Sequence, residues 1–127
     1  MLPFRVEFKT GLPVYEQVVY AAKKAIVSGQ LLPGDTFPSV RTLSQELKMN
    51  PNTAHKVVMT LVSDGLLEVK PGIGTLIAKA PSATGTQRST LLNDEVERLV
   101  VEAKNLSLGL KEVLDAVKRH WNGLHKR

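Results

Sequence analysis

Residues 39–77 read SVRTLSQELKMNPNTAHKVVMTLVSDGLLEVKPGIGTLI, and the spacing of their apolar residues decides the fold. Ser39 and Asn50 are residue types that cap helix N-termini, and Pro51 suits the first position of a helix. Apolar residues then recur at intervals of three and four, which predicts two helices with the buried faces Val40, Leu43 and Leu47, and Ala54, Val57, Val58, Leu61 and Val62. The break between them at residues 48–49 is short, as in a helix-turn-helix.

The residues after Gly65 follow a strand pattern instead. Residues 66–70 and 75–79 are β-compatible and flank the turn sequence Pro71-Gly72-Ile73-Gly74, which predicts a hairpin. Upstream, a helix that has Pro13 in its first turn and stops at Gly29 is indicated by one apolar face: Tyr15, Val18, Val19, Ala22, Ala25 and Ile26. Three helices followed by a hairpin indicate a winged helix-turn-helix, a mainly α fold with a small β-hairpin.

The chain after this domain has a different composition. Residues 80–90 are rich in Ser, Thr, Gly and Pro and predict a linker or loop, so the expected parts are a domain at 1–79, a linker at 80–90 and a helical hairpin at 91–127. The first apolar stripe of that hairpin consists of Leu92, Val96, Leu99, Val100 and Ala103. The second consists of Leu110, Val113, Leu114, Val117 and Trp121. Two short helices cannot bury both stripes against each other, so they need either the N-terminal domain or a second chain to cover them. We expect a second chain, which makes the helices a two-helix dimerisation appendage.

The composition narrows the classes of function. The chain has 127 residues, 17 Lys+Arg against 12 Asp+Glu, a formal net charge of +5 and no cysteine, which excludes disulfides and thiol nucleophiles and favours a polyanionic partner. Residues 1–13 lack the apolar core of a signal peptide, and no apolar run is long enough for a membrane helix, so we expect a cytoplasmic protein. No metal-ligand spacing, cofactor motif or paired nucleophile and base is apparent, so we expect no enzyme, no cofactor and no metal.

Polar and basic residues that suit DNA occupy the helix-turn-helix and the hairpin. They are Ser39, Arg41, Asn50, Asn52, Thr53, His55, Lys56, Lys70, Gly72 and Gly74. The N-terminal end of a recognition helix reaches base edges, where an Asn amide pairs with adenine, and an Arg at a helix N-terminus suits a phosphate. The alternatives are a solvated polar face with ordinary caps, an ion pair of Arg41 with Glu46 or Asp64, and glycines that serve only the turn.

Six short segments together resemble the N-terminal domain of GntR-family bacterial transcription regulators. They are PVYEQ at 13–17, GQLLPGD at 29–35, FPSVRTL at 37–43, NPNT at 50–53, DGLL at 64–67 and GIGT at 72–75. The resemblance implies that Arg41 and the first turn of the third helix touch DNA and that the glycine hairpin reaches the minor-groove side. NPNT and the short helical C-terminal part look like the YtrA-like subgroup, whereas many family members carry Arg in the recognition helix, so their base preference does not transfer.

We therefore predict a homodimeric, sequence-specific DNA-binding repressor that recognises an inverted-repeat operator in double-stranded DNA. Activation by the same binding is the other outcome of such a contact. The alternatives from other classes are a winged-helix module that binds DNA without specificity or binds proteins, and an accessory subunit of an enzyme. The sequence leaves open whether a small-molecule effector exists, and no cluster of polar residues points to its site.

Overall fold

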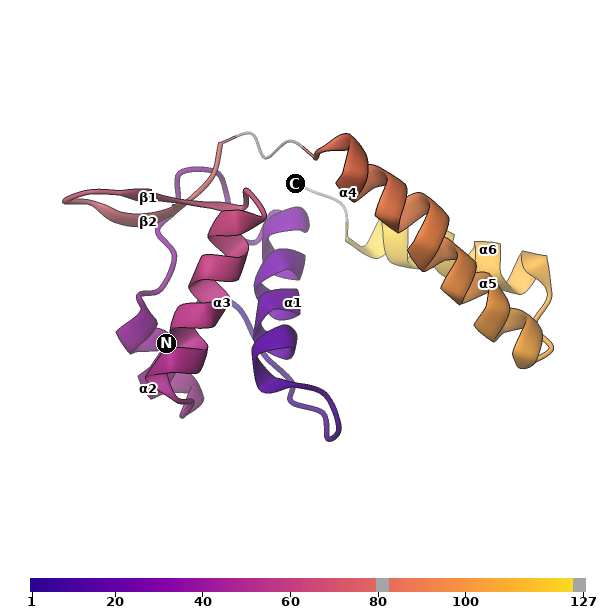
Figure 1. Cartoon of the computed structure of the whole chain (residues 1–127), viewed down its shortest axis with the longest axis horizontal. Coiled ribbons are helices and arrows are strands. Elements are labelled where there is room, and N and C mark those ends of the chain that lie inside the picture. The colour runs from indigo at the N-terminus through magenta and orange to yellow at the C-terminus, as the bar shows by residue number, and fades with distance from the viewer. Residues whose placement is uncertain (80–82, 125–127) are drawn as a thin grey trace. The chain divides into compact units, whose positions relative to one another are not determined.

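The computed structural model describes residues 1–79 and 83–124, which form two compact units on either side of the gap. Figure 1 shows three helices and a hairpin in the first unit and a helical second unit. No helix in these described ranges is long and apolar enough to cross a membrane. Each unit is considered by itself below.

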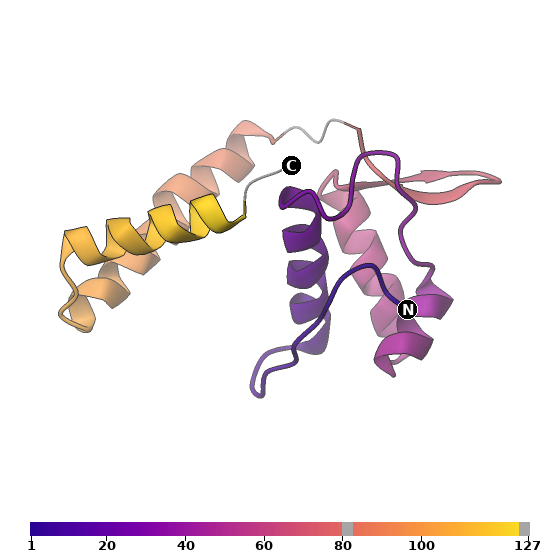
Figure 2. The same cartoon turned by 180° about the vertical axis from the view of Figure 1, so that it is seen from behind.

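The first unit is built on the helices α1 (Val14–Val27), α2 (Val40–Leu47) and α3 (Pro51–Ser63). α3 packs against both α1 and α2, as the two opposite views in Figures 1 and 2 show. The predicted caps are present: Ser39 Oγ accepts a hydrogen bond from the Thr42 N–H at 3.1 Å, and Asn50 Oδ1 accepts one from the Asn52 N–H at 2.8 Å. Pro13 lies directly before α1, whereas we predicted it inside the first turn of the helix.

The hairpin consists of strand β1 (Leu67–Lys70) and strand β2 (Gly74–Ile77), which are antiparallel, with Leu67 opposite Ile77 and Lys70 opposite Gly74. It extends away from the helices (Figure 1), and both strands are shorter than the predicted runs. Thr36 pairs with Leu76 at its base, where the Phe37 N–H donates to the Thr75 carbonyl at 2.8 Å. This backbone pairing fixes the root of the hairpin to the segment before α2.

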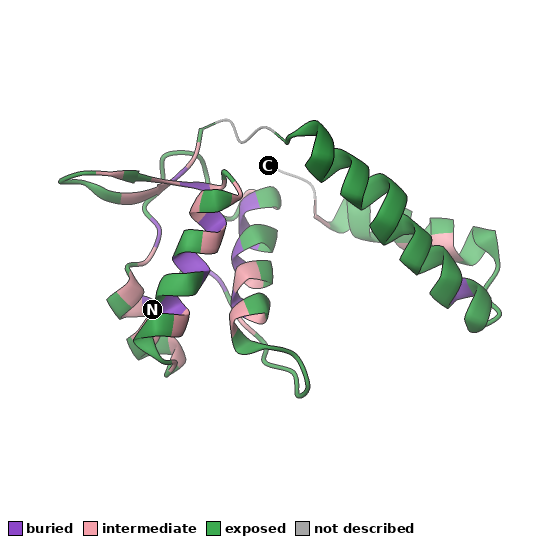
Figure 3. Ribbon diagram, in the orientation of Figure 1, coloured by how far each residue is buried: buried purple, intermediate pink, exposed green. Residues whose placement is uncertain are grey.

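The core of the first unit lies between the three helices and the root of the hairpin, where Figure 3 shows the buried residues. The side chains of Val18, Leu43, Val57, Leu61 and Ile77 are almost completely buried, which confirms the predicted inner faces. The sequence did not reveal that the N-terminal segment also belongs to this core. Phe4 is only 4% exposed and stacks on Phe37, with 5.7 Å between the ring centroids.

The second unit begins inside the predicted linker. Thr84 caps α4 (Gly85–Ser89), with its hydroxyl accepting from the Gln87 N–H while the Gln87 carboxamide accepts from the Thr84 N–H, so the expected loop at 80–90 is wrong from residue 85 onward. The reciprocal cap satisfies two N–H groups that a helix start leaves free, which outweighs the weak helix propensity of the segment. Residues 80–82 of the predicted linker lie outside the described residues.

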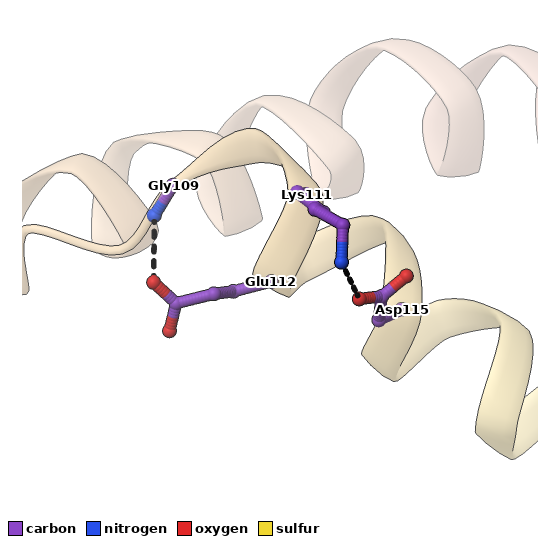
Figure 4. Close-up of polar contacts among 4 residues, drawn as sticks. All are labelled: Gly109, Lys111, Glu112 and Asp115. Carbon is purple, nitrogen blue, oxygen red and sulfur yellow. Dashed lines mark hydrogen bonds and ion pairs between the residues drawn. The ribbon is translucent and has the colours of Figure 1, made fainter.

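The helix continues from α4 through the π-helix η1 (Thr90–Glu95) into α5 (Val96–Asn105). A turn with Ser107 at a φ of 60° leads to α6 (Leu110–Gly123). In that turn the Leu108 N–H donates to the Ala103 carbonyl at 2.8 Å. Figure 4 shows the start of α6, where the Glu112 carboxylate accepts from the Gly109 N–H at 3.4 Å and Lys111 pairs with Asp115 at 3.3 Å.

Candidate nucleic-acid interface

The turn that joins α2 to α3 is held by local hydrogen bonds. Lys48 has a φ of 51°, the left-handed conformation that reverses the chain at the end of α2. The Met49 N–H donates to the Ser44 carbonyl at 3.1 Å, and Ser44 Oγ donates to the Met49 carbonyl at 2.7 Å. These bonds fix the direction in which α3 leaves the turn, and therefore what its first residues present to a partner.

The two asparagines at the start of α3 differ in what their side chains do. The side-chain oxygen of Asn50 accepts the capping hydrogen bond of α3. The side-chain amide of Asn52 is exposed and has no hydrogen-bond partner among residues 1–79 and 83–124. Thr53 is half-buried, and His55, about one turn after Asn52, is exposed. Asn52 thus offers both a donor and an acceptor to a ligand, and its side chain caps no backbone group among the described residues.

Arg41 is the second residue of α2, at the end of the helix where the backbone dipole favours an anion. Its side chain is exposed and makes no ion pair within the described part of the chain. Both acids that we considered as its partners are engaged elsewhere: Glu46 pairs with the amino group of Met1, and Asp64 pairs with Lys23 at 3.8 Å. The guanidinium is therefore available to a phosphate. Ser39, by contrast, is engaged in the cap of α2, where its hydroxyl also donates to Thr42 Oγ1 at 3.0 Å.

Lys56 has a partner that sequence reasoning missed. Its Nζ lies 3.9 Å from the centroid of the Tyr15 ring on α1, a cation–π contact that ties α3 to α1. The two residues are far apart in sequence, and Tyr15 was assigned only to the apolar face of α1, so no local pattern revealed the pair. Lys56 is thus directed toward α1, while Asn52 and His55 remain without side-chain partners in the described residues.

The hairpin carries the remaining predicted residues. Lys70 ends β1 and is half-buried, and the Ile73 N–H donates to its carbonyl at 3.0 Å. Pro71 and Gly72, with a φ of 79°, occupy the middle of this turn, and Gly74 has a φ of 124°. A side chain is strained at both glycines, so the turn itself requires them. That requirement does not exclude a second use of their bare backbone at a ligand.

Residues 14–77 match the family described as "Bacterial regulatory proteins, gntR family", which is half of the chain and all of the helix-turn-helix and hairpin. The chain belongs to the GntR family. It is a DNA-binding transcription regulator of that family, and the winged helix described above is its GntR domain.

Two relatives extend the likeness beyond the GntR domain. The uncharacterized HTH-type transcriptional regulator YhcF of Bacillus subtilis is 31% identical over 117 residues, which cover 92% of this chain and 97% of YhcF. The HTH-type transcriptional repressor YtrA of the same organism is 28% identical over 115 residues, which cover 90% of this chain and 88% of YtrA. The alignments are long enough to include most of the helical second unit.

Two solved structures are also similar. A transcriptional antiterminator from Listeria monocytogenes EGD-e has the same fold, with a TM-score of 0.80 at 24% identity, over 92% of this chain and 88% of that one. The DNA-binding domain of AraR, solved in complex with operator ORX1, matches 58% of this chain and 95% of its own length, with a TM-score of 0.52 at 33% identity. The AraR domain thus covers a fraction of this chain similar to that of the GntR match at residues 14–77.

The second unit of this GntR protein leaves its apolar stripes uncovered. Both predicted stripes lie on helices, but Ala103 is the one residue that is buried among those described in this unit. Figure 3 shows the unit almost entirely in the colour of exposed residues. The exposed or half-buried members of the predicted stripes are Leu92, Val96, Leu99, Val100, Leu110, Val113, Leu114, Val117 and Trp121.

Proposed function

We propose that this protein is a sequence-specific repressor that binds an inverted-repeat operator as a homodimer in the cytoplasm. The observation that carries the proposal is that Arg41 and Asn52, at the starts of α2 and α3, have exposed side chains with no partner among the described residues. In this scheme Arg41 contacts a phosphate and sets the register of the domain on the duplex. Asn52 reads a base edge in the major groove, where an amide pairs bidentately with adenine.

The exposed stripes of the second unit support the homodimer. Stripes of this length on two amphipathic helices are stable in water only when another surface covers them, and a second copy supplies an identical apolar surface. Dimerisation links two winged helices, so that the second half-site contact becomes intramolecular and affinity rises without new contacts. Two-fold symmetry of the protein then requires two-fold symmetry of the operator.

The names of similar proteins agree with this scheme. YtrA of Bacillus subtilis is called a transcriptional repressor, and the AraR domain was solved on operator DNA. We infer repression by occupancy, in which the bound dimer blocks polymerase, and we assign the protein no catalytic step. The competing function is a winged helix that coats DNA without sequence preference.

Fragment selection decides between these two functions. Wild-type protein is mixed with sheared DNA of its host, bound fragments are recovered over several rounds, and the enriched duplex is titrated in a gel shift with excess random DNA. We expect one enriched sequence with an inverted repeat whose complex survives the competitor. Enrichment of unrelated sequences, or loss of the complex in proportion to the competitor, would contradict sequence specificity.

The dimer has its own test with a matched pair of variants. Leu99→Glu places a charge in the stripe of α5, whereas Val101→Glu places the same charge on an exposed position of that helix outside the predicted stripe. We expect light scattering to give a dimer for wild type and Val101→Glu and a monomer for Leu99→Glu, with weaker binding of the selected duplex. A Leu99→Glu protein that remains dimeric would show that the stripe is not the interface.

A further inference from the structure

An open groove lies beside α1 in the first unit, and none of the predicted DNA-binding residues lines it. It has a volume of about 750 Å³ and lies between residues of the N-terminal segment 4–12 and one face of α1. Figure 2 shows the segment crossing in front of α1, with α3 behind the helix. Sites for small molecules have volumes of about 300–1,000 Å³, so the groove has room for a ligand.

Two glutamine side chains hold the segment across α1. At one end the Gln17 carboxamide accepts a hydrogen bond from the Lys9 N–H at 2.6 Å and donates one to the Lys9 carbonyl at 3.0 Å. At the other end Gln30 Nε2 donates to the Pro3 carbonyl at 2.9 Å. No hydrogen bond joins residues 4–8 to α1 within the described ranges, so the segment is fixed at its ends and leaves the groove open between them.

The walls of the groove combine three kinds of side chain. They carry cations at Arg5, Lys9 and Lys24, carboxylates at Glu7 and Glu16, and an exposed aromatic ring at Tyr20. All of these side chains are exposed, and none forms an ion pair or a side-chain hydrogen bond in the part of the chain that the structure describes. Glu16, Tyr20 and Lys24 share one face of α1 because they are four residues apart. The fold thus gathers charged groups without partners around one ring.

A nucleoside phosphate has a complementary part for each kind of side chain. Lys and Arg bind phosphate oxygens, an aromatic ring stacks on a nucleobase, and a carboxylate accepts hydrogen bonds from ribose hydroxyls. An inorganic anion would leave the ring and the carboxylates unused, and an apolar ligand would bury charged groups without partners. The lining therefore favours a ligand that is aromatic and anionic and that carries hydroxyl groups.

We propose that this groove is a binding site for a nucleoside phosphate. The base stacks on the Tyr20 ring, and the phosphates contact Arg5, Lys9 and Lys24. The ribose hydroxyls donate to the carboxylate of Glu16, which lies four residues from Tyr20 on the same face of α1. The site gives the regulator a small-molecule ligand, and its occupancy does not depend on DNA or on the proposed function.

The test is isothermal titration calorimetry of the full chain, without DNA, against ATP, GTP, CTP and UTP in turn. Adenosine and inorganic tripolyphosphate serve as probes that carry only the nucleoside or only the phosphates. We expect at least one of the four nucleotides to bind, and adenosine and tripolyphosphate to bind more weakly by about tenfold or more, because each makes only part of the contacts.

Two pairs of variants locate the bound nucleotide. Tyr20→Ala is expected to weaken binding by about fivefold to 150-fold, because the stacking surface for the base is lost. Its matched control is Phe8→Ala, which removes an exposed ring from the same segment without touching the lining of the groove. Arg5→Ala is expected to weaken binding by about threefold to tenfold, and Lys79→Ala, which removes an exposed cation elsewhere, is expected to bind as wild type does. The circular dichroism melts of all four variants are expected to match wild type, since these side chains are exposed.

Several results would overturn this inference. They are the absence of binding by all four nucleotides, equal binding of tripolyphosphate and nucleotide, and a loss in Phe8→Ala as large as that in Tyr20→Ala. Binding that survives in Tyr20→Ala and disappears in Arg41→Ala would also overturn it, because the nucleotide would then occupy the candidate nucleic-acid interface. None of these results bears on operator selection, so the site and the proposed repressor are tested separately.

Discussion

Replacing Arg41 by Ala tests the assignment of a phosphate contact. The guanidinium is exposed and has no ion-pair partner in the described residues, so its removal is expected to change the free energy of unfolding by less than about 0.5 kcal/mol. Each phosphate contact contributes about 0.9 to the slope of log affinity against log salt concentration. A dimer that loses one contact per subunit therefore has a slope smaller by about 1.8, and it loses affinity for specific and random DNA alike.

The assay is fluorescence anisotropy of a labelled duplex, titrated at several salt concentrations between about 50 and 200 mM, with the selected duplex and a scrambled one. Arg41→Lys keeps a positive charge and is expected to keep most of the slope while losing the paired geometry of the guanidinium. Lys24→Ala removes an exposed cation from α1 and controls for net charge, with an expected slope near that of wild type.

One result would refute the phosphate assignment. If Arg41→Ala leaves the slope unchanged and alters the preference among operator variants, the side chain reads base edges instead. An early unfolding transition would instead point to a structural role that the contacts around Arg41 do not reveal.

Four other changes have defined outcomes. Asn52→Ala is expected to weaken the free energy of operator binding by about 1–3 kcal/mol and to relax the base preference at one base pair per half-site, whereas Pro51→Ala is expected to leave the base preference intact. Titration of both variants against all single-base operator variants checks this. A uniform loss of affinity by Asn52→Ala across those operators would rule out base readout. Lys56→Ala is expected to lower the free energy of unfolding in urea by about 0.5–1 kcal/mol, because the contact with the Tyr15 ring is lost, and an unchanged midpoint would show that the contact is energetically neutral. Lys48→Gly is expected to raise that free energy by about 1 kcal/mol, since glycine adopts a φ of 51° without the penalty of a side chain, and a lower midpoint would contradict this. Trp121, the single tryptophan and 79% exposed in the isolated chain, is expected to fluoresce at shorter wavelength in wild type than in monomeric Leu99→Glu, and identical spectra would place it outside the interface.

Local signals in the sequence were sufficient for most of the first unit. Caps act through hydrogen bonds within three residues, so Ser39 and Asn50 revealed the starts of α2 and α3 without any tertiary information. The hairpin was equally readable, because Pro71-Gly72 restricts the backbone to a turn. The same local reasoning had the signal for α4 available in Thr84 and Gln87, but the Gly and Ser content of the segment favoured a loop.

Contacts between distant residues were beyond the reach of the pattern. The stack of Phe4 on Phe37 and the contact of Lys56 with Tyr15 join positions whose proximity depends on the whole fold. The candidate site shows the same division. The positions of Arg41 and Asn52 at helix starts followed from the sequence, but only the structure revealed that the acids considered for Arg41 are engaged elsewhere.

The stack of Phe4 on Phe37 bears on how such domains are exchanged between regulators. The family match begins at residue 14, so a fusion joined at that point would omit Phe4. Phe37 would then lose its stacking partner and face water in a unit whose helices and hairpin were all retained. Deleting a buried Phe side chain lowers the free energy of unfolding by roughly 3–5 kcal/mol, which is a large part of the stability of a small domain. The transplanted module would therefore fold poorly because Phe4 is missing, whatever domain it is joined to. The portable piece of this regulator therefore begins before Phe4.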